Sequence, residues 1–182
     1  MAEFQLRRNI EISLAVVALL WVIFLADWFM PADFRLYGLR PRRVDGLAGI
    51  VFSPFLHADF RHLLSNSGAL LVLLAVALSL DRKWTAEAVA IIILCGGGGV
   101  WLFGRPNTVH IGASGVIFGL IGFLVFIGLF QRRWKTLAVS LLVAALYGGV
   151  VLTLFSYASG VSWSGHFWGF AAGVLAAWWL RK

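Results

Sequence analysis

Residues 137–180 read LAVSLLVAALYGGVVLTLFSYASGVSWSGHFWGFAAGVLAAWWL. They contain no Asp, Glu, Lys or Arg and a single histidine, His166. A helix crosses the core of a bilayer with about 20 mainly apolar residues, so this stretch is long enough for two crossings. Its more polar middle, residues 156–164, divides it. We therefore predict two membrane-spanning helices, at 137–156 and 165–180.

Four more apolar blocks of similar length precede this stretch, at residues 12–30, 62–80, 85–104 and 112–130. Together the six blocks predict an all-α integral membrane protein with one domain, residues 1–182, built as a bundle of six transmembrane helices. Arg7 and Arg8 precede the first block as in a signal peptide. That block is long and lacks a small-residue cleavage motif, so we interpret it as a retained span.

The composition excludes most other classes of protein. Counted with glycine and without tyrosine, roughly 70 per cent of the 182 residues are apolar, against about 45–50 per cent in soluble domains. The net charge of +7 does not indicate a nucleic-acid partner, because the charges lie between the apolar blocks and not on one patch. One cysteine, Cys95, allows no intramolecular disulfide.

Basic residues favour the cytoplasmic side of a membrane. Six spans with both termini inside place nine basic residues in the cytoplasm and six outside, so this orientation is favoured. The inside set is Arg7, Arg8, Arg82, Lys83, Arg132, Arg133, Lys135, Arg181 and Lys182, and the outside set is Arg35, Arg40, Arg42, Arg43, Arg61 and Arg105.

The long first loop, residues 31–61, is too apolar for an ordinary solvated segment. Pro41, Pro54 and several glycines interrupt its apolar residues. Short amphipathic pieces lying in the headgroup region fit this pattern. A loop packed on the end of the helix bundle fits it equally well.

Polar side chains within spans are costly and need partners, so each is a candidate for function. Ser114, in Gly112-Ala113-Ser114-Gly115, falls in or near the first turn of the helix predicted at 112–130. Free N–H groups and the helix dipole at such a position stabilise a developing oxyanion. His166 begins the last span, which enters from the same side. Ser114 and His166 are therefore expected at similar depth.

Small residues on both helices allow these two side chains to approach. Gly115 and Gly119 form one small-residue ladder, and Gly165, Gly169 and Gly173 form another. Such ladders let helix backbones pack closely, which makes a Ser–His hydrogen bond possible. A purely structural interpretation stays open, in which the glycines only pack the helices, the serine fills space and the histidine caps its helix.

His62 and Asn66 are four residues apart, on one face near the outer start of the second span. An imidazole and an amide are good donors to an oxyanion in a dry site, although the pair could equally bond only within the bundle. We expect His57 to anchor the end of the first loop by hydrogen bonds. His110 is expected to be a loop residue without a role.

All eight acidic residues lie at or before Glu87, and no carboxylate completes a triad in an obvious way. A Ser–His dyad without Asp is the simplest catalytic interpretation. Phe118, one turn after Ser114, could orient the His166 ring by stacking. No metal site is expected, since no H-E-x-x-H motif occurs.

Three motifs in this order resemble those of the rhomboid family of intramembrane serine proteases, in its compact six-span bacterial form. They are His57-x4-His62-x3-Asn66, Gly112-Ala-Ser114-Gly115-x2-Phe118-Gly119 and His166-x2-Gly169-x3-Gly173. The first loop departs from the family in having no Trp-Arg pair.

The resemblance implies a serine endopeptidase without a cofactor, in which Ser114 is the nucleophile and His166 the general base and then acid. His62, Asn66 and the Ser114 N–H would form the oxyanion site, with His57, Gly112, Gly115, Phe118 and Gly169 in support. The implied substrates are transmembrane proteins, cut in or near their spans, with a small residue before the cut. The implied location is the bacterial cytoplasmic membrane, with the active site facing outward.

Two other functions remain open at this point. The chain could be a catalytically silent rhomboid-like binder that escorts transmembrane helices, although retention of both Ser114 and His166 argues against it. A metal or proton transporter using the four histidines is disfavoured because no intramembrane acidic pair offers a cation route.

Overall fold

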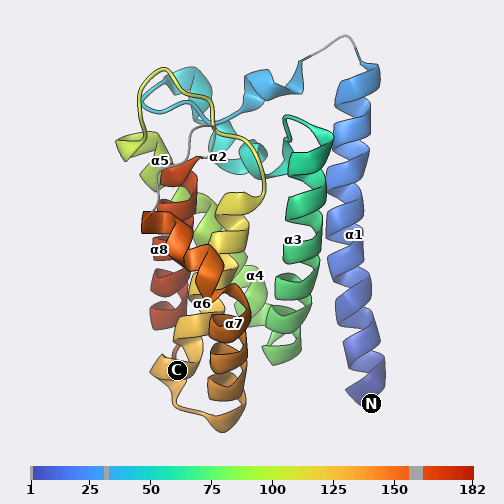
Figure 1. Cartoon of the computed structure of the whole chain (residues 1–182), viewed down its shortest axis with the longest axis vertical. Helices are drawn as coiled ribbons and strands as arrows, with labels where there is room; N and C mark the ends of the chain where they lie inside the picture. Colours follow the sequence, from blue (N-terminus) through green and yellow to red (C-terminus); the bar gives the residue numbers. More distant parts are fainter. Residues whose placement is uncertain (1, 31–32, 156–161) are drawn as a thin grey trace.

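A computed structural model describes residues 2–30, 33–155 and 162–182, which form a bundle of helices (Figure 1). The principal helices run roughly along one axis, and both termini lie at the same end of the bundle. The bounds are α1 Ala2–Phe29, α2 Gly49–Phe52, α3 Phe60–Leu80, α4 Arg82–Ile91, α5 Gly97–Phe103, α6 Ser114–Gln131, α7 Trp134–Leu152 and α8 Trp163–Trp179.

The predicted all-helical class is confirmed. Within the described ranges, five helical segments are long and apolar enough to cross a membrane: α1, α3, α4 continued into α5, α6 and α7. The sixth predicted span, α8, has 17 residues. At about 1.5 Å per residue, it covers roughly 25 Å, slightly less than the hydrocarbon core of about 30 Å. The count of six spans and their orientation therefore stay predictions.

Most element ends differ from the predicted spans by only a few residues. The exception is α1, which begins at Ala2, ten residues before the predicted span. Its first turns are polar, and Arg7 bonds Glu11 one turn later at 3.0 Å. A helix can thus continue past the apolar block that hydropathy detects. The predicted end of the fifth span, Ser156, lies outside the described residues.

One predicted span, 85–104, is a helix with an irregular centre. Between α4 and α5, residues Ile92–Gly96 form a π-helical turn that leads into Gly97, Gly98 and Gly99. A π-turn inserts one extra residue into the ladder and often lies near a functional site. Here Gly96 and Gly99 pack closely on the last helix. A Cβ on Gly96 would be 3.3 Å from the Gly169 Cα, and one on Gly99 would overlap the Trp168 ring.

The helix α6 lies in the centre of the bundle, between α3, α7 and α8 (Figure 1). Buried residues occupy all of its faces from Val116 to Leu124, whereas α1 and α7 remain largely exposed. A helix that is apolar all round is expected in such a central position. Its first residue, Ser114, therefore begins a helix that is packed between α3, α7 and α8.

Close packing of α6 on α8 follows the two predicted glycine ladders. A Cβ on Gly169 would overlap the backbone carbonyl of Gly115, and one on Gly173 would overlap the carbonyl of Gly119. Without side chains between them, the two backbones are in contact. This contact brings the start of α8 beside the start of α6.

Polar contacts tie the remaining helices to this centre. Near the termini, Arg82 donates to the buried Asn9 side chain at 2.8 Å, and Asn9 donates to Ser79 at 3.1 Å. This cluster joins α1 to α3 and α4. On the other side, Ser140 of α7 donates to the Leu124 carbonyl of α6 at 2.6 Å.

The first loop is packed on the opposite end of the bundle. It forms short helical turns at Phe34–Tyr37, Val44–Gly46, Gly49–Phe52 and Ser53–Phe55. Leu39 and Leu56 are buried, while Tyr37, Val44 and Phe52 are exposed. The described part of the loop thus packs on the bundle while exposing aromatic residues, and its location in the headgroup region stays a prediction. Residues 31–32 lie outside the described ranges.

Substitution of Gly173 by alanine tests the importance of the α6–α8 contact. Because the new methyl group must displace the Gly119 backbone, we expect Gly173→Ala to lose about 1–3 kcal/mol of stability. The measurement is thermal unfolding in detergent. The matched control is Gly148→Ala in α7, where a Cβ meets nothing within 4 Å and alanine favours the helix. Equal unfolding temperatures for the two variants would contradict this packing.

Candidate active site

Ser114 is the first residue of α6, and a tight turn leads into it. Gly112 has φ of +111°, a conformation that suits glycine. Its N–H donates to the Ser53 carbonyl of the first loop at 2.8 Å. The first N–H groups of α6 have no acceptors within the helix, so the Ser114 hydroxyl lies beside free donors.

His62 and Asn66 of α3 face this turn. A Cβ on Gly112 would be 2.6 Å from His62 Nε2 and 3.5 Å from Asn66 Nδ2. Asp59 caps the helix by accepting the His62 N–H at 2.9 Å, which fixes the turn that carries the imidazole. The structure therefore brings both side chains to the start of α6. Glycine at 112 keeps open the space between them.

The Asn66 amide is available as a donor. Asn66 is buried, and its Nδ2 has no hydrogen-bond partner among the described residues. Buried polar groups are nearly always paired, so an unpaired one calls for an explanation. A role as donor to the negative charge that develops during a reaction explains why this amide N–H has no acceptor in the resting site.

His166 lies in the first turn of α8 and packs against α6. Its ring stacks on Phe118 with centroids 4.1 Å apart and an interplanar angle of 12°. Its backbone N–H donates to the Ser162 carbonyl at 3.1 Å. No hydrogen bond joins the Ser114 hydroxyl to the His166 ring, although both residues are among those described. Such bonds are often long in a resting site and tighten with substrate.

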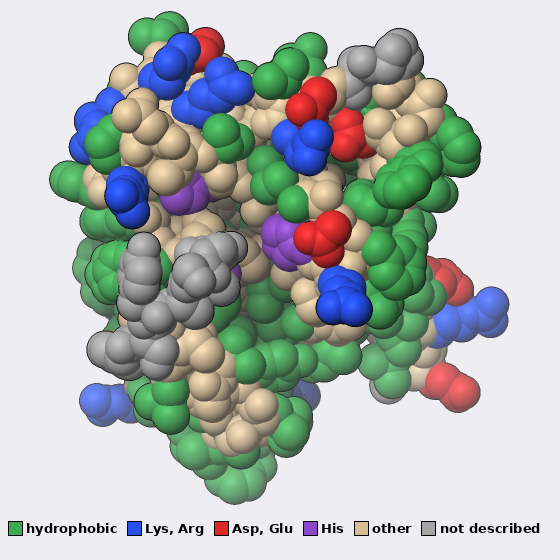
Figure 2. Space-filling model, turned by 45° about the horizontal axis from the view of Figure 1, so that its top comes forward, with side chains coloured by type: hydrophobic (Ala, Val, Ile, Leu, Met, Phe, Trp, Pro, Cys, Tyr) green, Lys and Arg blue, Asp and Glu red, His purple; other side chains and the backbone are tan. Residues whose placement is uncertain are grey.

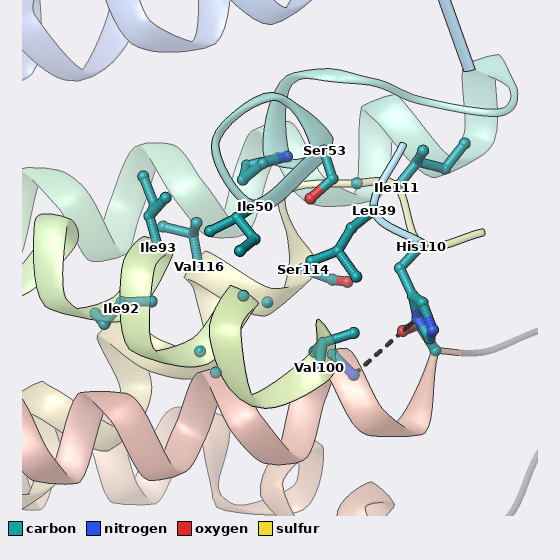
Figure 3. A pocket seen from close by; sticks show the side chains of 18 residues that line it. Leu39, Ile50, Ser53, Ile92, Ile93, Val100, His110, Ile111, Ser114 and Val116 are labelled. Carbon is teal, nitrogen blue, oxygen red and sulfur yellow. Dashed lines mark hydrogen bonds between the residues drawn. The ribbon is translucent and has the colours of Figure 1, made fainter. Parts of the chain in front are cut away.

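Ser114 also lines a cavity of about 50 Å³. Figure 3 shows Ser114 there with Leu39 and Ser53 of the first loop, Val100 of α5 and His110. The walls are mainly apolar. With the end opposite the termini turned toward the viewer, histidine side chains appear in and beside a hollow, with basic and acidic residues around it (Figure 2). A cavity of this size accepts a small side chain or a water molecule.

His57 links the first loop to the start of α6. It is buried, and its Nε2 accepts the Ala113 N–H at 3.4 Å. Its ring lies edge-on to His62, with centroids 5.1 Å apart. Burial, followed by the nearby charge of His62, lowers the pKa of His57 to about 4. His57 is therefore neutral near pH 7, as an acceptor at Nε2 requires.

His110 has more contacts than its expected role as an idle loop residue implies. Its ring bonds Thr108 at 2.9 Å and Ser162 at 2.6 Å, and its backbone forms both hydrogen bonds of a bridge to Leu39. Three further neighbours of the site were not predicted from the sequence: Ser162, Leu39 and Ser53. They are ordinary residues in distant segments, and no spacing rule connects them.

Within the ranges that the structure describes, no group of three or more His, Cys, Asp or Glu is arranged to hold a metal ion. A hydroxyl at the start of α6, an imidazole at the start of α8 and an unpaired amide facing the turn before the hydroxyl are suited to acyl transfer.

Comparison with known proteins gives an independent view of the chain. The family model of the rhomboid domain matches residues 45–182. An uncharacterized protein of Mycobacterium tuberculosis is 42% identical over 178 residues, covering 92% of this chain and 73% of the relative. An uncharacterized protein of Mycobacterium leprae is 39% identical over 179 residues, covering 92% of this chain and 69% of the relative. A Bacillus subtilis protein named "Putative rhomboid protease YdcA" is 30% identical over 132 residues, with 66% and 60% covered.

The burial of neutral His57 predicts a pH dependence of stability. In the unfolded chain its pKa returns to about 6.5, so between pH 6.5 and 4 the unfolded state binds more protons. The folded state is therefore expected to lose stability as the pH falls through this window. Thermal unfolding between pH 7.5 and 5 measures the slope, and His57→Gln should flatten it. Parallel slopes for parent and variant would contradict a buried neutral His57.

Proposed function

The chain belongs to the rhomboid family, and we propose that it is an intramembrane serine protease. It hydrolyses peptide bonds in or near the transmembrane segments of membrane proteins, through a dyad of Ser114 and His166. The observation that carries this proposal is the stacking of His166 on Phe118, one turn from Ser114, with the unpaired Asn66 amide facing the turn before it.

In this mechanism His166 removes the Ser114 proton as the hydroxyl oxygen attacks the carbonyl carbon. Negative charge then develops on the substrate oxygen. Asn66 Nδ2, the His62 ring N–H and the Ser114 backbone N–H stabilise that charge. His166 next gives its proton to the leaving amine, and a water molecule, activated by the same imidazole, hydrolyses the acyl-enzyme and regenerates Ser114.

The cavity beside Ser114 supports a preference for a small substrate side chain. Its volume of about 50 Å³ and its apolar walls suit an alanine-sized group better than a large or charged one. Binding of a larger side chain would require the first loop or the π-helical turn to move. The substrates proposed are therefore transmembrane proteins with a small residue at the cut.

For the membrane orientation, we propose six spans with both termini in the cytoplasm. Both ends of the chain lie at the same end of the bundle, as an even number of crossings requires (Figure 1), and the site lies at the opposite end. In a bacterial cytoplasmic membrane the site would then open to the outer side. The arrangement of basic residues supports this orientation.

Loss of the nucleophile tests the proposal directly. The purified parent should react with a fluorophosphonate probe and cleave a generic transmembrane substrate, and Ser114→Ala should do neither. Ser65→Ala is the matched control, because Ser65 is exposed and bonds only within α3. Cleavage by folded Ser114→Ala would end the proposal. A folded parent without turnover, with helix binding retained in Ser114→Ala, would instead indicate a binder.

The oxyanion role of Asn66 has its own expected outcome. Asn66→Ala should reduce kcat by about 10²–10³-fold with little change in KM, since the lost bond forms only in the transition state. Asn9→Ala at the other end of the bundle is the control, as it removes another buried amide. Equal losses of kcat in the two variants would show that Asn66 acts only through stability.

A further inference from the structure

His110 joins three segments that are distant in the sequence. Its N–H and carbonyl pair with Leu39 of the first loop at 2.9 and 3.0 Å. Its Nε2 contacts the Thr108 hydroxyl at 2.9 Å, and its Nδ1 contacts the Ser162 hydroxyl at 2.6 Å. The second contact reaches the start of the helix that carries His166.

The directions of these hydrogen bonds follow from their partners. Thr108 donates its proton to the Arg105 carbonyl at 2.6 Å, so its oxygen must accept from His110 Nε2–H. Nδ1 of a neutral imidazole is then an acceptor, and Ser162 donates to it. The Ser162 oxygen in turn accepts the Gly165 N–H at 3.2 Å, so each donor has one acceptor.

A neutral His110 fits its surroundings, because burial lowers the pKa of this loop histidine. A protonated ring would carry a second N–H at Nδ1. The Ser162 proton would then lose its acceptor. With a neutral ring, every donor in this chain of hydrogen bonds has an acceptor, and Ser162 is held between the His110 ring and α8.

Ser162 controls the first turn of α8. It is the N-cap residue. Its hydroxyl oxygen accepts the Gly165 N–H, and its backbone carbonyl accepts the His166 N–H at 3.1 Å. A shift of Ser162 would therefore move both ends of the turn that carries the catalytic imidazole. Phe118 holds one face of that imidazole, but stacking alone leaves the ring free to slide in its plane.

We propose that His110 is a positioning residue, which fixes the first turn of α8 through Ser162 and thereby aims the His166 imidazole at Ser114. This inference rests on the proposed Ser114–His166 dyad. The contact joins the loop before the nucleophile to the cap of the helix that bears the base. It thus sets the distance between the two catalytic helices at the end where chemistry occurs.

The test compares His110→Asn with His110→Gln in the full-length protein. The Asn oxygen can take the place of Nδ1 and accept from Ser162, whereas the longer Gln amide reaches the Nε2 position near Thr108. We expect His110→Gln to lower kcat and the rate of fluorophosphonate labelling by about 10–100-fold, as a misplaced base does, with KM nearly unchanged. His110→Asn should keep most of the parent's kcat and labelling rate.

Substitutions of Ser162 provide the second arm. Ser162→Gly removes the hydroxyl at little cost to the cap, and it should lose activity as His110→Gln does, whereas Ser162→Thr should retain it. The double variant, His110→Gln with Ser162→Gly, should lose no more activity than either single variant, because both changes remove the same hydrogen bond between His110 and Ser162. Additive losses, or full activity in His110→Gln, would overturn the inference.

The outcomes separate this inference from the proposed function. A parent that labels at Ser114, with variants that label equally fast, refutes positioning and leaves the protease intact. If the parent is not labelled, the proposed protease function is refuted, and ¹⁵N spectra of the histidine rings then test the His110–Ser162 hydrogen bond by itself. They should show His110 with Nδ1 as an acceptor in the parent and a shifted Nδ1 in Ser162→Gly. No shift would overturn the inference.

Discussion

Backbone contact between α6 and α8 is the constraint on which the rest of the structure depends. Apolar side chains provide little net attraction between helices in a lipid environment, so close packing and hydrogen bonds must hold a bundle together. The glycines of the two helices meet without side chains between them. This contact sets Ser114 and His166 at one level, and α6, which is buried on all sides, also packs against α3, α4 and α7.

Polar groups are distributed unequally along this bundle. At the end near the termini, Asn9, Ser79 and Arg82 satisfy one another and join helices. At the opposite end, Asn66 Nδ2 and His57 Nδ1 are buried without partners among the described residues. Unpaired buried groups cost stability. Two of the three such atoms in the described residues lie at the end that carries Ser114, where a site prepared for a transient charge would have them, and the third, Gln131 Oε1, ends α6 near the termini.

The first loop completes the site instead of merely covering it. Ser53 accepts the Gly112 N–H, His57 accepts the Ala113 N–H and Leu39 pairs with His110. Each of these hydrogen bonds holds in place one of the few residues that lead into α6. The loop also supplies part of the wall of the small cavity. Motion of this loop would therefore change both the cavity and the turn before the nucleophile.

The sequence by itself determined the helical membrane class, the rhomboid family and the residues that group at one end, because hydropathy and motif spacing act locally along the chain. The early start of α1 was missed, since a helix continues where hydropathy stops. Only the tertiary structure decided which groups meet. Ser162 and His110 are 52 positions apart, and the unpaired state of Asn66 depends on every neighbour. Glycine spacing predicted that two helices would pack closely, but which side chains of distant segments then bond one another depends on the whole arrangement of the bundle.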